Sequence, residues 1–155
     1  MFRSFILKLT GYCNLNCSYC YMFNSVDQTF TRKPRILPVD VSQHALRAIS
    51  EHARTHGLQS VEIALHGGEP SLWPLENFRE FFAGVEALRS SGLDVSLSMQ
   101  TNLLQKLRVD LLELLVQHKV GLGVSIDGPR EINDAERYDF AGNGSYDRIM
   151  RNIAG

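Results

Sequence analysis

The stretch LDVSLSMQ at residues 93–100 decides the fold class. Its apolar side chains alternate with Asp, Ser and Gln, which predicts a β-strand with one apolar and one polar face. The same alternation recurs at residues 5–10, 61–66 and 120–127. Strands covered by helices on both faces would be apolar throughout. We therefore expect a curved sheet with helices outside and a polar cavity inside.

Helical periodicity lies between these strands. Apolar residues recur every three or four positions in Val41–His56, Leu75–Ser90 and Lys106–His118, and a fourth helix is expected from near Ser145. A strand followed by a helix about every 30 residues predicts parallel βαβ units. The expected fold is α/β, a partial (β/α)6 TIM-like barrel with about four βα units present, in preference to a flavodoxin-like doubly wound sheet.

Composition narrows the function classes. A chain of 155 residues has room for one domain, expected to span residues 1–155. A formal net charge of −1 argues against nucleic acid or an anionic membrane as the partner. We find no apolar run of the roughly 18 residues that span a bilayer and no signal peptide, so the expected location is the cytoplasm.

Three cysteines form the most unusual feature. Cys13, Cys17 and Cys20 lie within eight residues, and the chain has three cysteines in all. An odd, crowded set does not form a disulfide framework and indicates metal or redox chemistry. A structural zinc site needs a fourth ligand, and His66 is a candidate for it. A hydrogen-bonded structural role for His66 is the alternative. A four-iron cluster held by three cysteines would leave one iron open.

Glycine or polar motifs follow the other predicted strands. They are Gly67-Gly68-Glu69-Pro70, Gln100-Thr101-Asn102 and Ser125-Ile126-Asp127-Gly128-Pro129. Ligand sites in parallel α/β folds gather at the carboxyl ends of the strands. We therefore expect these motifs and the cysteine loop to form one site.

The cysteine loop resembles a known family. Residues 13–20 match the CxxxCxΦC signature, with Φ aromatic, of the radical S-adenosylmethionine (SAM) enzymes. The resemblance implies a [4Fe–4S] cluster held by Cys13, Cys17 and Cys20, with SAM on the open iron. It also implies reductive cleavage of SAM to a 5′-deoxyadenosyl radical that abstracts hydrogen from a peptide or protein side chain. A reductant such as flavodoxin or ferredoxin would supply the electron.

The resemblance further implies which residues contact SAM. It implies that Tyr19 lines the adenine pocket, that the GGEP element takes the SAM amino group, and that Ser125 bonds the ribose. The complete expected set is Tyr19, Gly67, Gly68, Glu69, Gln100, Asn102, Ser125, Asp127 and Arg137. Structural alternatives are a core aromatic for Tyr19, a plain turn for GGEP, a helix cap for Gln100 and Asn102, and a solvated charge for Arg137.

Further features indicate which subgroup of this family the chain resembles. The SIDGP stretch at 125–129 resembles an element of SPASM-type peptide and protein modifiers, and the general likeness is to cyclophane-forming peptide maturases. The long connection Tyr21–Pro38 is expected to cover the cluster or meet a peptide substrate. Many family members have Gly where this chain has Leu103, a residue not expected to take a left-handed conformation.

The length suggests that the chain is the N-terminal portion of a radical SAM core domain. Any auxiliary-cluster cysteines and the residue that completes the reaction would then follow Gly155, so no catalytic residue is assigned. Two alternatives stay open. The first is a truncated or non-catalytic SAM- and iron–sulfur-binding module, and the second is a structural zinc protein.

Overall fold

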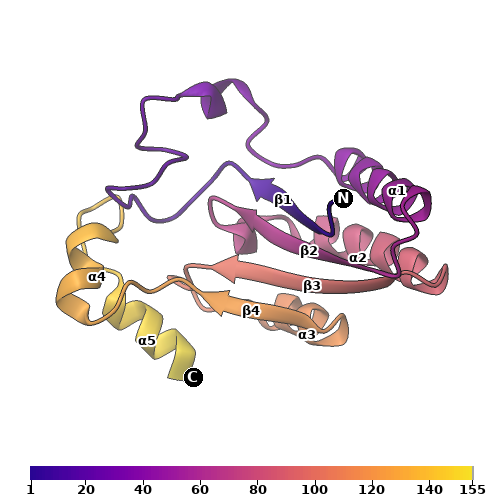
Figure 1. Ribbon diagram of the computed structural model, residues 1–155. Helices are drawn as coiled ribbons and strands as arrows, with labels where there is room; N and C mark the ends of the chain where they lie inside the picture. The colour runs from indigo at the N-terminus through magenta and orange to yellow at the C-terminus, as the bar shows by residue number, and fades with distance from the viewer. Residues whose placement is uncertain (155) are drawn as a thin grey trace.

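A single four-stranded parallel sheet organises the molecule. The computed structural model describes residues 1–154, so Gly155, the last residue of the expected domain, lies outside the described residues. The strands are β1 (Ser4–Thr10), β2 (Ser60–Gly67), β3 (Asp94–Thr101) and β4 (Val120–Val124), in the order β1-β2-β3-β4 (Figure 1). Each strand pairs in parallel with the next, and the sheet is open. The expected partial α/β barrel is confirmed.

The helices lie mainly on one face of the sheet. Helices α1 (Val39–Thr55), α2 (Leu75–Ser90) and α3 (Val109–Gln117) connect successive strands behind the sheet in the view of Figure 1. Short α4 (Arg130–Glu136) and α5 (Tyr146–Ala154) follow β4. Single 3-10 turns occur at η1 (Thr29–Arg32) and η2 (Pro70–Leu72). No helix among residues 1–154 has the length and apolar character needed to cross a membrane.

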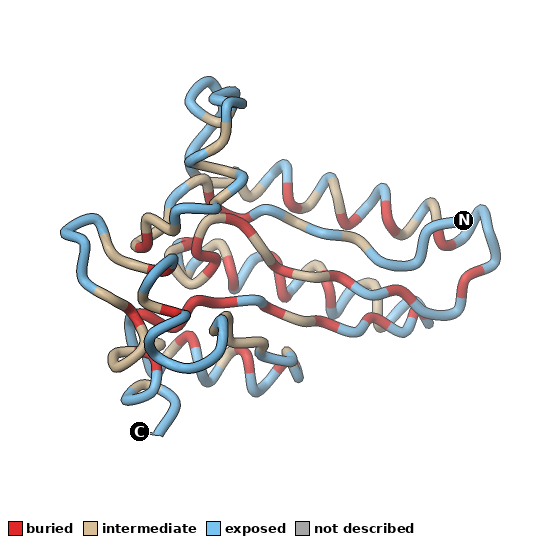
Figure 2. Tube along the Cα trace, turned by 60° about the vertical axis from the view of Figure 1, so that its left-hand side comes forward, coloured by how far each residue is buried: buried red, intermediate tan, exposed pale blue. Residues whose placement is uncertain are grey.

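Strand alternation separates the two faces as the sequence predicted. Buried and exposed residues alternate along β2 and β3 (Figure 2). Ile63 of β2 and Leu97 of β3 face the helices, where Phe78, Phe81 and Phe82 of α2 are fully buried. Burying one such side chain contributes about 1.5–3 kcal/mol, so this contact holds the helices to the sheet.

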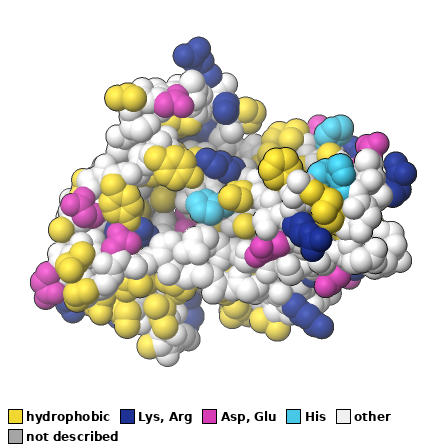
Figure 3. Space-filling view, viewed as in Figure 1, with side chains coloured by type: hydrophobic (Ala, Val, Ile, Leu, Met, Phe, Trp, Pro, Cys, Tyr) yellow, Lys and Arg dark blue, Asp and Glu magenta, His cyan; other side chains and the backbone are white. Residues whose placement is uncertain are grey.

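Within residues 1–154, no helix covers the opposite face of the sheet, and we refer to it as the open face. Lys8 and the exposed Ile6 of β1 lie on this face with Glu62 and His66 of β2. Charged, histidine and apolar side chains are mixed on the surface seen in Figure 3. A mixed face of this kind matches the polar interior expected for the barrel.

The structure corrects two predicted boundaries, the end of β4 and the start of α3, and adds one helix that was not predicted. The strand predicted to reach Asp127 ends at Val124, so Ser125 and Asp127 stand in the loop beyond it. Helix α4 was not predicted, because its seven residues are too few to show an apolar period. Helix α3 begins at Val109 rather than Lys106, because residues 102–108 form a turn first.

The expectation for Leu103 was wrong. Its φ of 48° is left-handed. Its backbone N–H donates to Oγ1 of Thr101 at 3.0 Å, and the next N–H, of Leu104, donates to Oδ1 of Asn102 at 2.9 Å. The Leu103 side chain is 9% exposed. These bonds and this burial offset the roughly 1–2 kcal/mol that the conformation costs.

Candidate functional site

A cavity of about 210 Å³ lies at the carboxyl ends of the strands, and we call it the cysteine cavity. It brings together the three cysteines and most of the residues expected to contact SAM. The lining comprises Cys13, Leu15, Cys17, Tyr19, Cys20, Tyr21, Met22, Phe23, His66, Gly67, Gly68, Gln100, Asn102, Ser125 and Arg137. Residues from four separate strand ends thus meet at one place, as parallel strands require.

The cysteine loop is anchored to the last residue of α4 and to the segment that follows it. The N–H of Asn16 donates to the carbonyl of Tyr138 at 2.8 Å, and the N–H of Ser18 donates to that of Glu136 at 3.0 Å. The Ser18 hydroxyl also donates to the Glu136 carboxylate. Backbone bonds on both sides of Cys17 therefore fix the loop against the far end of the sheet.

All three cysteines are free thiols of intermediate exposure. Burial raises the pKa of Cys13 and of Cys17. At Cys17 the cation of Arg137 acts in the opposite direction and favours the thiolate. The burial effect is the larger of the two, so the pKa of Cys17 stays above its usual value.

The two glycines at the end of β2, Gly67 and Gly68, allow a close approach of two backbones. Gly67 has a φ of 150°, and a Cβ on Gly68 would lie 2.0 Å from the carbonyl oxygen of Tyr12. The N–H of Gly68 donates to the carbonyl of Thr10 at 2.9 Å, and that of Glu69 donates to Tyr12 at 2.6 Å. No larger residue fits at Gly68 while the turn stays against the cysteine loop.

Glu69 does not line the cysteine cavity. Its side chain is 1% exposed, and Oε1 accepts from the hydroxyl of Thr101 at 2.7 Å and from the N–H of Ser71 at 3.1 Å. Its Oε2 accepts from the N–H of Asn102 at 2.8 Å. The carboxylate thus ties the end of β2 to the end of β3. It supports the cavity wall from behind.

Tyr19, Asp127 and Arg137 form one polar cluster. The Tyr19 hydroxyl donates to Oδ2 of Asp127 at 2.5 Å and accepts from Nη1 of Arg137 at 2.8 Å. Burial and the bond to Asp127 raise the Tyr19 pKa, while Arg137 opposes them. Tyr19 is 54% exposed, so it is not a core aromatic. Asp127 is not among the residues that line the cavity.

Arg137 is not a solvated surface charge. It is 8% exposed, and Nη1 lies 3.8 Å from Oδ1 of Asp127. Its Nε is buried and has no hydrogen-bond partner among residues 1–154. A buried guanidinium donor without a partner costs free energy unless a ligand satisfies it. Arg137 is therefore a buried cation of the cavity lining, with one donor that the described residues leave unpaired.

The remaining polar residues of the wall bond to one another. Nε2 of Gln100 donates to the Ser125 hydroxyl at 2.7 Å. Nδ2 of Asn102 donates to Oδ1 of Asn14 at 2.8 Å and lies 3.5 Å from Sγ of Cys13. Arg108 occupies the N-cap position of α3 and makes no side-chain capping bond, so neither Gln100 nor Asn102 caps that helix.

Comparison with known proteins decides the family. The family model of the Radical SAM superfamily matches residues 7–154. The chain belongs to this superfamily. A cysteine-type anaerobic sulfatase-maturating enzyme of Clostridium novyi is 29% identical over 141 residues, which are 91% of this chain and 36% of that enzyme. A serine-type enzyme of Bacteroides thetaiotaomicron is 26% identical over 141 residues, 91% of this chain and 33% of its own length.

Solved structures agree with this radical SAM assignment. The structure of anSMEcpe with bound AdoMet superimposes with a TM-score of 0.80 at 26% identity, covering 97% of this chain and 39% of that one. The structure of anSMEcpe with bound AdoMet and the Cp18Cys peptide gives 0.79 at 25% identity, covering 97% and 38%. The chain therefore spans between a third and two fifths of the length of these relatives.

The donor set fits the cofactors of a radical SAM protein. Three free thiols on one loop and a buried guanidinium with an unpaired Nε line the same cavity. Within the described residues, no three His, Cys, Asp or Glu side chains are grouped to hold a single metal ion. A four-iron cluster does not need such a group, because each cysteine binds a different iron. Membership of the superfamily argues against a structural zinc protein.

Leu15, Met22 and Phe23 were not predicted as individual site residues, although the connection Tyr21–Pro38 was expected to cover the cluster. Leu15 is buried beside the cysteines, and Met22 and Phe23 line the cavity from the long connection. The ring of Phe23 stands 5.2 Å from that of Phe30, edge to face, which steadies the connection. The aromatic residues of that segment were the available signal. Their exact position depends on the close approach to Gly68.

Proposed function

We propose that this chain forms the cofactor-binding part of a radical SAM enzyme that modifies a peptide or protein side chain. Cys13, Cys17 and Cys20 would hold a [4Fe–4S] cluster, and SAM would occupy the neighbouring cavity. When bound, these cofactors supply the electron and the 5′-deoxyadenosyl radical that abstracts hydrogen from the substrate. The observation that carries the proposal is the meeting of three free thiols and the largely buried Arg137 in the lining of one cavity.

The residues of the chain have defined tasks in this proposal. The Arg137 guanidinium presents a fixed set of donors, which suits a carboxylate such as that of SAM. The hydroxyl of Tyr19 holds the guanidinium in place at 2.8 Å. Gly68 lets the backbone after β2 lie against the cysteine loop. Glu69 holds the ends of β2 and β3 together next to it. Leu15, 2% exposed, shields the cysteine loop from water.

Relatives support a peptide or protein as the substrate. The named relatives are sulfatase-maturating enzymes, and one solved neighbour contains both AdoMet and a peptide. Ile6 and Lys8 are exposed on the open face of the sheet, which is the proposed surface for the polypeptide. A resemblance to cyclophane-forming maturases stays a prediction. The electron is proposed to come from a flavodoxin or ferredoxin, and the location is proposed to be the cytoplasm.

Anaerobic reconstitution tests the proposal. The full-length protein is loaded with iron and sulfide, reduced with dithionite and incubated with SAM. We expect a broad iron–sulfur absorption band and release of 5′-deoxyadenosine. A colourless protein that retains zinc under these conditions contradicts the proposal. A cluster that binds SAM without cleaving it favours the non-catalytic module instead.

A further inference from the structure

A second, basic cavity of about 290 Å³ lies between the turn after β3 and helix α5, and we call it the basic cavity. Its lining comprises Leu104, Gln105, Lys106, Arg148, Arg151 and Asn152. None of these lining residues is acidic, and none of them lines the cysteine cavity. Three cations therefore gather at one place in a chain whose formal net charge is −1.

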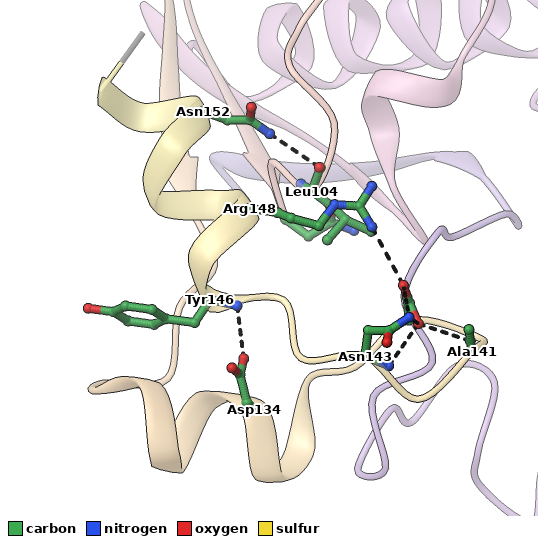
Figure 4. A network of polar contacts seen from close by, with 9 residues as sticks. Leu104, Asp134, Ala141, Asn143, Tyr146, Arg148 and Asn152 are labelled. Atoms are coloured by element: carbon green, nitrogen blue, oxygen red, sulfur yellow. Dashed lines mark hydrogen bonds and ion pairs between the residues drawn. The ribbon is translucent and has the colours of Figure 1, made fainter.

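Two arginines of the basic cavity differ in their ion pairs. Nη1 of Arg148 lies 3.5 Å from Oδ2 of Asp139, whose other oxygen accepts from the N–H groups of Ala141 and Asn143 at 2.9 Å (Figure 4). Arg151 lies on the last turn of α5, is exposed, and makes no ion pair within residues 1–154. No acidic side chain of the described residues therefore neutralises the charge of Arg151.

A chain of hydrogen bonds joins the basic cavity to a cysteine. Nδ2 of Asn152 donates to the carbonyl of Leu104 at 3.2 Å (Figure 4), and the N–H of Leu104 donates to Oδ1 of Asn102 at 2.9 Å. Nδ2 of Asn102 lies 3.5 Å from Sγ of Cys13. The turn at 102–104 is thus the wall between the two cavities, with Cys13 directly behind it.

We propose that the basic cavity is the docking surface for an acidic one-electron carrier protein of the flavodoxin type. This inference rests on the proposed function, because the electron is delivered to a cluster held at Cys13. The reduced carrier loses one electron and the cluster gains it, with no bond or proton changing place at the docking surface. Charge complementarity selects an acidic partner, and docking behind the wall leaves the SAM cavity free.

A binding titration tests the surface without any catalytic readout. Oxidised flavodoxin is titrated into the full-length, reconstituted protein at low ionic strength, comparing the wild type with Arg151→Glu. The matched control is Arg54→Glu, which makes the same charge change on an exposed residue in the last turn of α1. We expect Arg151→Glu to weaken binding about five- to tenfold and the control less than twofold. Added salt should weaken wild-type binding as well.

Reduction kinetics separate this inference from the proposed function. We expect Arg151→Glu to slow cluster reduction by reduced flavodoxin while leaving reduction by dithionite unchanged, because dithionite needs no docking surface. A wild type whose cluster dithionite cannot reduce overturns the proposed function, and the titration still decides the docking surface. Equal flavodoxin affinities for Arg151→Glu, Arg54→Glu and the wild type overturn the docking surface.

Discussion

The hydroxyl of Tyr19 accepts a hydrogen bond from Nη1 of Arg137 at 2.8 Å, joining residues 118 positions apart in the chain. It links the cysteine loop to the segment after α4. The same hydroxyl donates to Asp127 beyond β4. One phenol thus fixes three parts of the site.

Replacing Tyr19 with Phe should weaken SAM binding about five- to tenfold. The ring stays, but the largely buried Arg137 loses the hydrogen bond that orients it. The measurement is the dissociation constant for SAM on the reconstituted protein. Tyr146→Phe, at a residue that does not line the cysteine cavity, serves as the control and should bind normally. Equal SAM affinities for Tyr19→Phe and Tyr146→Phe would contradict the proposal that the Tyr19 hydroxyl positions Arg137.

Replacing Glu69 with Gln should lower the free energy of unfolding by about 1–3 kcal/mol. The buried carboxylate accepts three hydrogen bonds, and a side-chain amide group cannot accept the bonds made to the oxygen it replaces. Urea denaturation measures the change. Glu76→Gln, on the exposed side of α2, should alter the value by less than about 0.5 kcal/mol. An unchanged free energy of unfolding in Glu69→Gln would contradict the proposal that this carboxylate holds the ends of β2 and β3 together.

Replacing Gly68 with Ala should distort the turn against the cysteine loop. The added Cβ would stand 2.0 Å from a backbone oxygen, so the turn or the loop must move. We expect a loss of about 1–3 kcal/mol in stability and weaker cluster retention. Gly121→Ala in β4, whose Cβ would meet nothing closer than 3.7 Å, is the matched control. Comparable stability of the two variants would refute the close approach.

Replacing Leu103 with Gly should cost about 1–2 kcal/mol less stability than the same change at the adjacent Leu104. Glycine relieves the left-handed conformation at φ 48°, and this gain partly offsets the lost burial. Leu104 has no positive φ and is 4% exposed against 9% for Leu103, so its replacement should cost the full amount of about 2–5 kcal/mol. Denaturation of both variants gives the comparison, and equal losses would show that the conformation at Leu103 carries no strain.

Much of the fold follows from sequence patterns because each pattern reflects one packing surface. The alternation at residues 93–100 predicted a strand with a helix face and an open face, and β3 has both. Seven-residue α4 escaped prediction because so short a helix has no repeating apolar face.

Some residues of the site could be predicted from local sequence, and others depend on tertiary packing. Local spacing indicated the three cysteines, which line one cavity. The packing of Glu69 depends on where the end of β3 lies, which local sequence does not specify. Adjacency of β2 and β3 was the available signal, since Glu69 and Thr101 stand at the ends of neighbouring strands. The burial of Arg137 likewise required the unpredicted α4.

The iron and acid-labile sulfide content of Cys17→Ala after anaerobic reconstitution tests most directly whether the three cysteines hold a cluster. Cys17 lies between the other two thiols and shares their cavity. We predict that the variant loses the cluster and its absorption band, while Ser25→Ala, in the exposed connection, loads like the wild type. A Cys17→Ala protein that retains the full iron and sulfide content would contradict the assignment of the three cysteines as cluster ligands.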